Sequence, residues 1–210
     1  MSHVVLYGDS IFDNASYVGR GEEMLSKLRA RLPGGHQASL RAVDGAVIEG
    51  VARQLQSLPE GATHIVISAG GNDALRYAPV LLQGARSMPD AVGKIADLQD
   101  DFRTKYRLML DAAQRHGLPL ALCTIYDVQL PDPTQRRLAA TALCVLNDVI
   151  TREAVRRKLP IIDLRVIFDD PGDWANSIEP SGQGGAKMAE AITSMLARHD
   201  FSGFSGVYTH

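Results

Sequence analysis

The sequence predicts one α/β domain, a three-layer α/β/α sandwich around a five-stranded parallel sheet. Three observations support this prediction. The length of 210 residues fits a single domain with a sizeable core. Short apolar runs alternate along the chain with helical patterns, as in parallel sheets joined by right-handed crossovers. Most of the runs lack apolar–polar alternation, so both faces of the sheet should be covered by helices.

Five runs rich in valine, isoleucine and leucine are the expected strands. They span residues 3–8, 37–43, 64–69, 118–125 and 159–164. In a parallel sheet of this type, ligands bind beyond the carboxyl ends of the strands. Residues that directly follow a strand are therefore the candidates for function.

The segments between these runs have helical periodicity. Apolar residues recur every three or four positions over 90–116, and Gly117 follows as a helix stop. Helices are also expected over 134–157 and 182–198, with shorter ones near 21–32, 48–57 and 73–83. The domain should end near residue 200, and the tail 201–210 should be loosely held.

Composition excludes several classes of function. The net charge is -2 and no block of lysine and arginine occurs, so nucleic acid is not an expected partner. The two cysteines, Cys123 and Cys144, lie in apolar runs and are typical of buried hydrophobic residues, not of a disulfide framework or zinc site. A strand begins almost at once, with no apolar leader or membrane span, which favours a cytoplasmic protein.

The tripeptide Gly-Asp-Ser follows the first expected strand directly. This position places Ser10 at the active edge of the sheet, near the start of the next helix. Backbone N–H groups and a positive helix end there favour an alkoxide or another anion. An isolated tripeptide of this kind is more often a plain turn with a capping serine, so the other strand ends decide its meaning.

The next two strand ends carry hydrogen-bond donors. Gly45 follows the second strand in "VDGAV", and Asn72 follows the third in "SAGGNDA". A loop glycine offers a closely approachable N–H, and an asparagine side chain offers an NH₂ group. Together with the N–H of Ser10, these donors form an expected oxyanion hole. Asp73 is expected to brace the glycine loop.

With these blocks in order and correctly spaced, nearly the whole chain resembles the SGNH (GDSL) hydrolases. The matching blocks are "GDSIFDN", "DGA" and "GGND". The resemblance implies a flavodoxin-like sheet, Ser10 as nucleophile, and Gly45 and Asn72 as oxyanion donors. It also implies hydrolysis of small-molecule carboxylic esters through an acyl-enzyme, without a metal or cofactor.

The fourth block departs from the family. The family has Asp-x-x-His-Pro before the last helix, with the histidine as base and the aspartate orienting it. This chain has "NSIEP" there, and the following "PSGQGG" keeps the register. Asn176 therefore stands in the place of the aspartate and Glu179 in the place of the histidine.

No other histidine is well placed for the role of base. Those at 3, 36, 64 and 116 lie at or just before strand starts, and His199 ends a helix that runs antiparallel to the strands. All five should lie at the opposite edge. His210 is on the tail, which spans at most about 35 Å from residue 199.

The leading hypothesis makes Glu179 the general base. A carboxylate at hydrogen-bond reach accepts a serine proton, and burial raises its pKa toward the useful range. Asn176 suits such a base because it can donate a hydrogen bond to the carboxylate, whereas an aspartate would repel it. The alternative is an inactive scaffold that binds an acylated ligand or a partner. A phosphate-binding site at "SGQGGAK" is disfavoured, because no strand precedes it and the full motif is absent.

Loops at the active edge are the expected substrate site. Phe12, Asp13 and Asn14 follow the nucleophile by one turn, and Trp174 precedes the fourth block. These four are the expected substrate-binding residues.

Further positions in the same loops have secondary expected roles. Asp173 is a reserve orienting group for the base. Additional apolar candidates for an acyl pocket are Leu81, Leu82, Met88 and Leu130.

Overall fold

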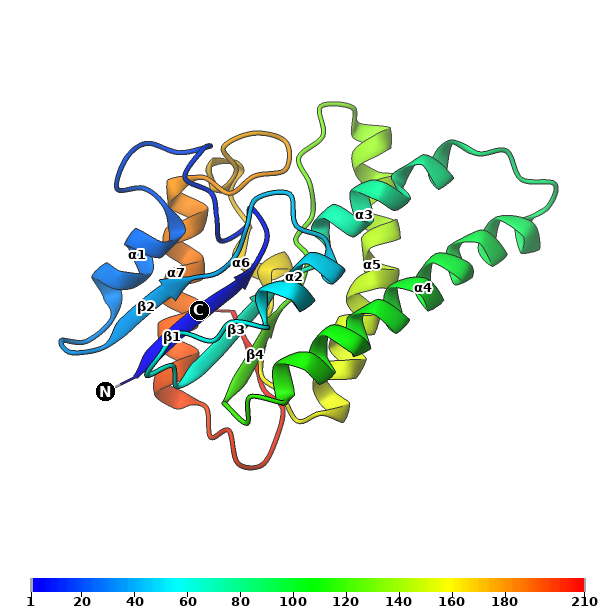
Figure 1. Cartoon of the computed structure of the whole chain (residues 1–210). Coiled ribbons are helices and arrows are strands. Elements are labelled where there is room, and N and C mark those ends of the chain that lie inside the picture. Colours follow the sequence, from blue (N-terminus) through cyan, green and yellow to red (C-terminus); the bar gives the residue numbers. More distant parts are fainter. Residues whose placement is uncertain (1, 210) are drawn as a thin grey trace.

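The computed structural model describes residues 2–209 of the chain. Its centre is a parallel sheet in the order β2-β1-β3-β4-β5-β6. Figure 1 shows the sheet with helices on either side, which confirms the expected α/β/α sandwich. The strands are β1 (His3–Gly8), β2 (Gln37–Leu40), β3 (His64–Ser68), β4 (Leu120–Cys123), β5 (Ile161–Ile162) and β6 (Val207–Tyr208).

The prediction of five strands is wrong by one. The tail expected to be loosely held supplies β6, whose neighbour β5 donates from Ile161 N to Gly206 O and from Asp163 N to Tyr208 O. Only two residues pair, and the surrounding tail is rich in glycine and serine, so the strand leaves almost no trace in the sequence pattern. A short edge strand of this kind also limits pairing with other chains.

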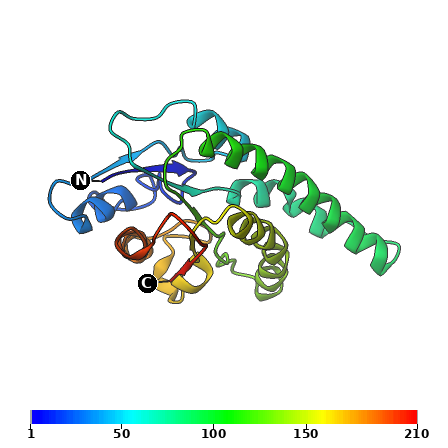
Figure 2. The ribbon, with the colours of Figure 1, turned by 90° about the horizontal axis from the view of Figure 1, so that it is seen from below.

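The helices form two layers. One face of the sheet is covered by α2 (Ile48–Gln54), α4 (Met88–Gln114) and α5 (Pro133–Arg156), and the other by α1 (Met24–Arg31), α6 (Leu164–Ile167) and α7 (Gly182–Arg198). Figure 2 shows the sheet between α2 and α7. In β1, Val5 and Tyr7 pack on the first layer while Val4 and Leu6 pack on the second, so the strand is apolar on both faces as expected.

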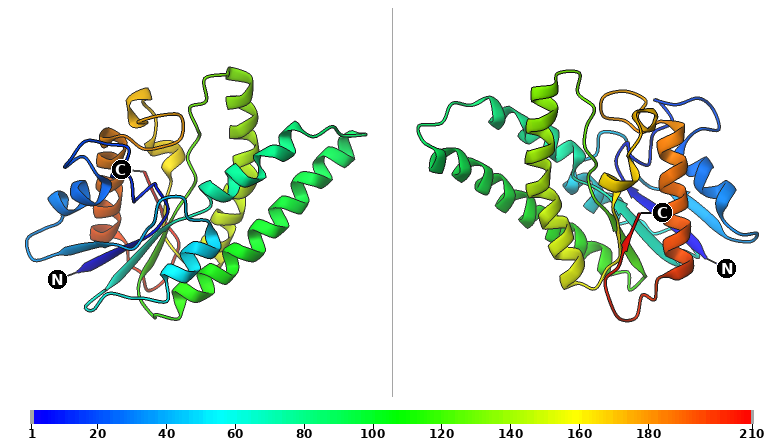
Figure 3. Two further views of the ribbon diagram at one scale, coloured as in Figure 1. Left: turned by 45° about the horizontal axis from the view of Figure 1, so that its top comes forward. Right: turned by 180° about the vertical axis from the view of Figure 1, so that it is seen from behind.

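One part of the molecule extends beyond the sheet. The helix α3 (Gly71–Tyr77) continues into the short 3₁₀ helix η1 (Ala78–Leu82), and a loop then returns into α4. Figure 3 shows this arm projecting past the sheet near the amino-terminal half of α5. The arm and the amino-terminal half of α5 wall the space beyond the carboxyl ends of β1, β3 and β4.

The last helix begins directly after the fourth block. Ser181 is its N-cap, and its Oγ accepts hydrogen bonds from the backbone N–H groups of Gln183 and Gly184. A second 3₁₀ helix, η2 (Pro171–Asp173), precedes the block. The block is therefore a short loop held between two helical segments.

Candidate active site

Ser10 lies in a tight turn at the carboxyl end of β1. The carbonyl of Asp9 accepts hydrogen bonds from Phe12 N and Asp13 N, at 3.1 and 3.0 Å, which closes the turn around the serine. Gln54 of α2 holds the strand end by donating to Gly8 O at 2.8 Å and accepting from Gly8 N at 3.0 Å. The serine is thus fixed by backbone bonds on both sides and is only 5% exposed.

Glu179 meets the serine across 169 positions of sequence. Ser10 Oγ donates to Glu179 Oε1 at 3.1 Å. Glu179 is 6% exposed, so this hydrogen bond is shielded from water. A carboxylate at this distance is within reach for accepting the serine proton.

The surroundings of Glu179 disfavour its charged form. Burial raises the pKa of its carboxyl group, the hydrogen bond from Ser10 opposes this, and the negative charge of Asp44 adds to the increase. Its second oxygen, Oε2, is buried with no hydrogen-bond partner among the described residues. A carboxylate in this state is a stronger base than an exposed glutamate.

The loop that carries Glu179 is a small hairpin. Trp174 and Pro180 form an antiparallel bridge, and Ala175 N donates to Glu179 O at 2.8 Å. Tyr126, at the end of β4, donates from its hydroxyl to Ile178 O at 2.6 Å. These bonds fix the backbone on each side of the carboxylate.

Asn176 acts on this backbone. Its Oδ1 accepts hydrogen bonds from Ile178 N at 2.9 Å and from Glu179 N at 3.0 Å, as in an Asx turn. The expected hydrogen bond from Asn176 to the carboxylate of Glu179 is not among its contacts. Asn176 shapes the turn that presents Glu179.

Asp173, the expected reserve orienting group, makes its hydrogen bonds to residues other than Glu179. It is fully buried, and its Oδ2 accepts from Asp169 N, Asp170 N and Lys187 Nζ, while its Oδ1 accepts from Gln183 Nε2. The bonds from Gln183 and Lys187 tie η2 to α7, and the other two close the backbone turn before η2. They leave the carboxylate no free role at the serine.

Asn72 lies in the first turn of α3, directly after β3, and Gly45 lies in the loop between β2 and α2. One N–H of the Asn72 amide donates to Ala46 O at 3.1 Å, which leaves its second N–H for a ligand. Gly45 has a φ of +74°, in the left-handed region that glycine adopts readily. Asp73 accepts from Ile48 N at 3.0 Å and so holds the start of α2 next to the Gly45 loop.

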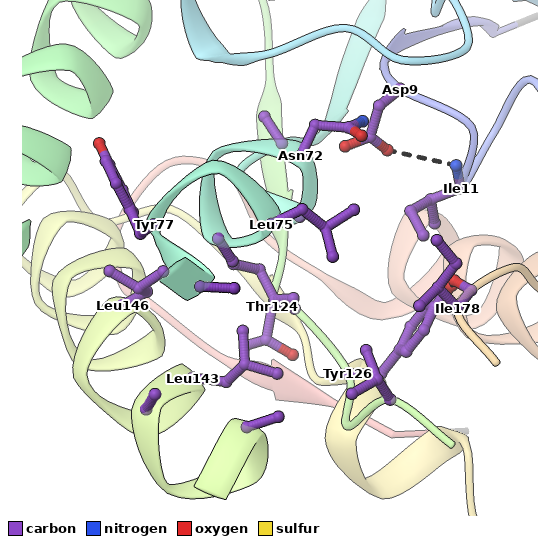
Figure 4. A pocket seen from close by; sticks show the side chains of 18 of the residues that line it. Asp9, Ile11, Asn72, Leu75, Tyr77, Thr124, Tyr126, Leu143, Leu146 and Ile178 are labelled. Atoms are coloured by element: carbon purple, nitrogen blue, oxygen red, sulfur yellow. Dashed lines mark hydrogen bonds between the residues drawn. The ribbon is translucent and has the colours of Figure 1, made fainter. Parts of the chain in front are cut away.

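Asp9 is a second buried carboxyl group beside the nucleophile. It is 1% exposed, and its Oδ1 accepts from Ile11 N at 3.2 Å, the dashed line in Figure 4. Burial raises its pKa to about 7, helped by the nearby charges of Glu179 and Asp73. Sequence reasoning assigned no role to this aspartate, although it stands inside the Gly-Asp-Ser motif.

An apolar pocket opens beside Ser10 and Glu179. Its volume of about 170 Å³ far exceeds the roughly 10–15 Å³ that holds one water molecule on the same measure. Its walls come from α3, η1, α4, α5 and the segment after β4. Figure 4 places Asp9, Asn72 and Ile11 at one side and Tyr77 and Leu146 at the other. The expected residues Leu81 and Leu130 line it, whereas Leu82 and Met88 are exposed.

The four expected substrate-binding residues do not line this pocket. Phe12 is in the core on the α1–α7 side of the sheet, and Trp174 packs on Tyr126 and Phe168. Asn14 is fully buried and accepts from Met24 N at 2.8 Å. Asp13 accepts from Asp44 N at 3.0 Å in the loop next to the site.

The described histidines lie at the amino edge of the sheet, as expected. His3 and His64 begin β1 and β3, His36 precedes β2, and His116 bonds to Leu55 O. His199 follows α7 and packs on aromatic residues of the tail. His210 lies outside the described residues.

No metal-ligand cluster and no membrane helix occur in the described part of the chain. Residues 2–209 contain no group of three or more His, Cys, Asp or Glu arranged to hold an ion. None of the helices in this range is long and apolar enough to cross a bilayer.

Comparison with known families gives a match over most of the chain. The sequence profile of the GDSL-like lipase/acylhydrolase family matches residues 6–187, which include Ser10, Gly45, Asn72 and Glu179. The chain belongs to this family. No curated protein sequence matches the chain significantly.

Solved structures share the fold of this family member at low sequence identity. A lipolytic G-D-S-L family protein from Veillonella parvula superposes with a TM-score of 0.71 at 13% identity, over 95% of this chain and 100% of that one. An extracellular lipase from Streptomyces rimosus gives 0.69 at 18%, over 92% and 99%. Phospholipase A1 from Streptomyces albidoflavus gives 0.68 at 16%, over 92% and 98%.

Proposed function

We propose that the chain is a serine-dependent carboxylic ester hydrolase in which Glu179 is the general base. The observation that carries this proposal is the buried hydrogen bond from Ser10 Oγ to Glu179 Oε1 at 3.1 Å. Membership of the GDSL family supports the reaction class, and the raised pKa of Glu179 supports its role. No histidine is needed for the serine to lose its proton.

The acylation step follows from these positions. Glu179 Oε1 takes the proton of Ser10 Oγ as this oxygen attacks the ester carbonyl carbon. The carbonyl oxygen becomes an oxyanion, which the N–H groups of Ser10 and Gly45 and the free N–H of Asn72 stabilise. The protonated Glu179 then gives its proton to the alcohol oxygen, the C–O bond breaks, and an acyl-serine remains.

Deacylation repeats the sequence with water. Glu179 takes a proton from a water molecule, whose oxygen attacks the acyl carbon. The carboxylic acid leaves when Ser10 Oγ takes the proton back. The unpartnered Glu179 Oε2 provides an acceptor for this water while Oε1 faces the serine.

Hydrolysis of p-nitrophenyl acetate by the wild type and Ser10→Ala tests the function. The wild type should cleave the ester, and Ser10→Ala should lose the activity. Equal rates for both proteins, or no activity of the wild type at any pH, would refute the proposal.

A further inference from the structure

The apolar pocket defines one half of the substrate. The apolar side chains that line the pocket come from the α3–η1–α4 arm, from the segment after β4 and from α5. They are Leu75, Leu81, Leu98, Ile125, Leu143 and Leu146. Because Ser10 and Glu179 line the same pocket, a chain bound there is joined directly to the reacting carbon. The buried area then contributes to binding through the hydrophobic effect.

Two of the polar side chains that line the pocket, away from Ser10, are already occupied. The hydroxyl of Tyr77 donates to Asp101 Oδ2 at 2.5 Å, and Thr124 Oγ1 donates to Asp163 Oδ1 at 2.9 Å. The pocket therefore offers a hydrocarbon surface away from the serine and few donors or acceptors for a polar substituent. An unbranched acyl chain matches this chemistry.

One side of the site, formed by residues of the loops after β1 and β2 that do not line the pocket, is acidic. Asp13 and Asp44 are linked there by the hydrogen bond from Asp44 N to Asp13 Oδ2, and Tyr17 donates to Asp44 Oδ2 at 2.8 Å. No ion pair joins either aspartate to a lysine or arginine within residues 2–209. The charge of Asp44 reaches Glu179, whose pKa it raises.

The unpartnered oxygen of Glu179, like the acidic loops, favours a ligand that carries a positive charge. Glu179 Oε2 is buried, belongs to the pocket wall and has no hydrogen-bond partner among the described residues. No cation among the ion pairs of the described chain compensates this carboxylate. A positively charged or donor group beside the ester bond would do so.

We propose that the substrate is an ester of an unbranched apolar acyl chain with a cationic alcohol. The acyl chain occupies the pocket between the α3–η1–α4 arm and α5, and the alcohol leaves across Asp13 and Asp44. This inference rests on the proposed ester hydrolysis. It excludes esters and thioesters whose leaving group carries phosphates, since these place negative charge against the acidic side.

The alcohol half is tested with three octanoyl compounds. Octanoylcholine should have a higher kcat/KM than methyl octanoate at low salt, by about fivefold for one unit charge near the site, and octanoyl-CoA should be the poorest. The first difference should shrink at about 1 M salt, where charges are screened within a few ångströms. Equal values for the choline and methyl esters at low salt, or efficient cleavage of octanoyl-CoA, would overturn the inference.

Charge-neutral variants locate the effect. Asp44→Asn keeps an acceptor for Tyr17 and should lower the ratio of choline to methyl ester activity. Glu60→Gln, an exposed acid in the loop before β3, is the matched control and should leave the ratio as in the wild type. An unchanged ratio in Asp44→Asn would contradict the acidic-side argument.

The acyl half is tested by chain length. From acetate through butyrate to octanoate, kcat/KM should rise about fourfold per methylene until the pocket is filled. Ala142→Phe, inside the pocket, should lower the octanoate-to-acetate ratio at least tenfold, whereas Thr141→Phe on the exposed side of α5 should preserve it. Both esters report on the same folded molecules, so the ratio is independent of yield. A flat chain-length profile in the wild type, or a wild-type ratio in Ala142→Phe, would overturn the assignment.

Binding separates this inference from the proposed function. If no ester is cleaved, the hydrolase proposal fails, and calorimetry with the Ser10→Ala variant still tests the site. Octyltrimethylammonium should bind more tightly than octyl sulfate. Equal or reversed affinities would overturn the substrate assignment, whatever the catalytic result.

Discussion

Replacing Glu179 by glutamine removes the proposed base with little change of shape. The side-chain amide of the Glu179→Gln variant keeps an oxygen that can accept from Ser10 Oγ at the 3.1 Å position, but it cannot take the proton. General-base catalysis contributes about 10²–10⁴-fold, so kcat/KM should fall by this factor. The loss corresponds to about 3–5 kcal/mol of transition-state stabilisation at 1.36 kcal/mol per tenfold.

The assay is initial-rate hydrolysis of p-nitrophenyl acetate across pH. Activity of the wild type requires ionised Glu179, so the rate should fall as the pH drops through the pKa of this group. Burial raises that pKa above its ordinary value, which places the acidic limb above the range of an exposed glutamate. Glu190→Gln, an exposed change on α7, is the control and should keep both rate and profile.

A stability measurement accompanies the rates. A glutamate whose pKa is raised in the folded state stabilises the fold below its unfolded pKa and loses this contribution as the pH rises through the folded pKa. Glu179→Gln should therefore match the wild-type Tm at acidic pH and exceed it at neutral pH. Full hydrolytic activity in Glu179→Gln would refute the assignment of the base.

Three other substitutions, one of them with a matched control, test the surroundings of the site. Asp9→Asn should stabilise the protein above pH 7 by on the order of 4 kcal/mol, because burial raises the pKa of Asp9 to about 7. Denaturant unfolding should show that this gain vanishes below pH 4. Gly70→Ala should lower stability by about 3 kcal/mol or more, since a Cβ would lie 2.8 Å from the Phe102 ring. Its control is Gly61→Ala, which has open space around the new Cβ and should cost about 1 kcal/mol. Tyr126→Phe removes the hydroxyl that holds the Glu179 loop and should cost about 1 kcal/mol while lowering kcat; unchanged kcat would show that this bond does not position the base.

The fold and the positions of Ser10, Gly45 and Asn72 follow from simple rules of the sequence, whereas Glu179 is expected at the site because it stands in the place of the family's histidine. Runs that are apolar at successive positions are characteristic of parallel strands covered on both faces, and the carboxyl-edge rule brings residues 10, 45 and 72 to one end of the sheet, where the family motif also puts residue 179. The structure places these positions there. Their catalytic roles stay proposals until the variants are measured.

The missed features depend on contacts that no local pattern encodes. Phe12 and Trp174 are aromatic residues next to motif positions, and only packing decides whether such side chains face a ligand or the core. Leu143 and Leu146 line the pocket because α5 stands beside the protruding arm, which depends on the relative placement of distant helices. The side chain of Asn176 can donate or accept hydrogen bonds. Sequence reasoning expected it to donate to Glu179, but in the folded turn its oxygen accepts from the backbone N–H groups of Ile178 and Glu179.

Reaction of Ser10 with an alkyl fluorophosphonate tests the proposed base most directly. The reagent modifies a serine only when its proton is removed, and mass spectrometry of the digested protein locates the adduct. The account predicts an adduct on Ser10, forming faster as the pH rises through the raised pKa of Glu179, and at least a hundredfold more slowly in Glu179→Gln. Equal rates in wild type and Glu179→Gln, or no adduct on Ser10, would contradict it.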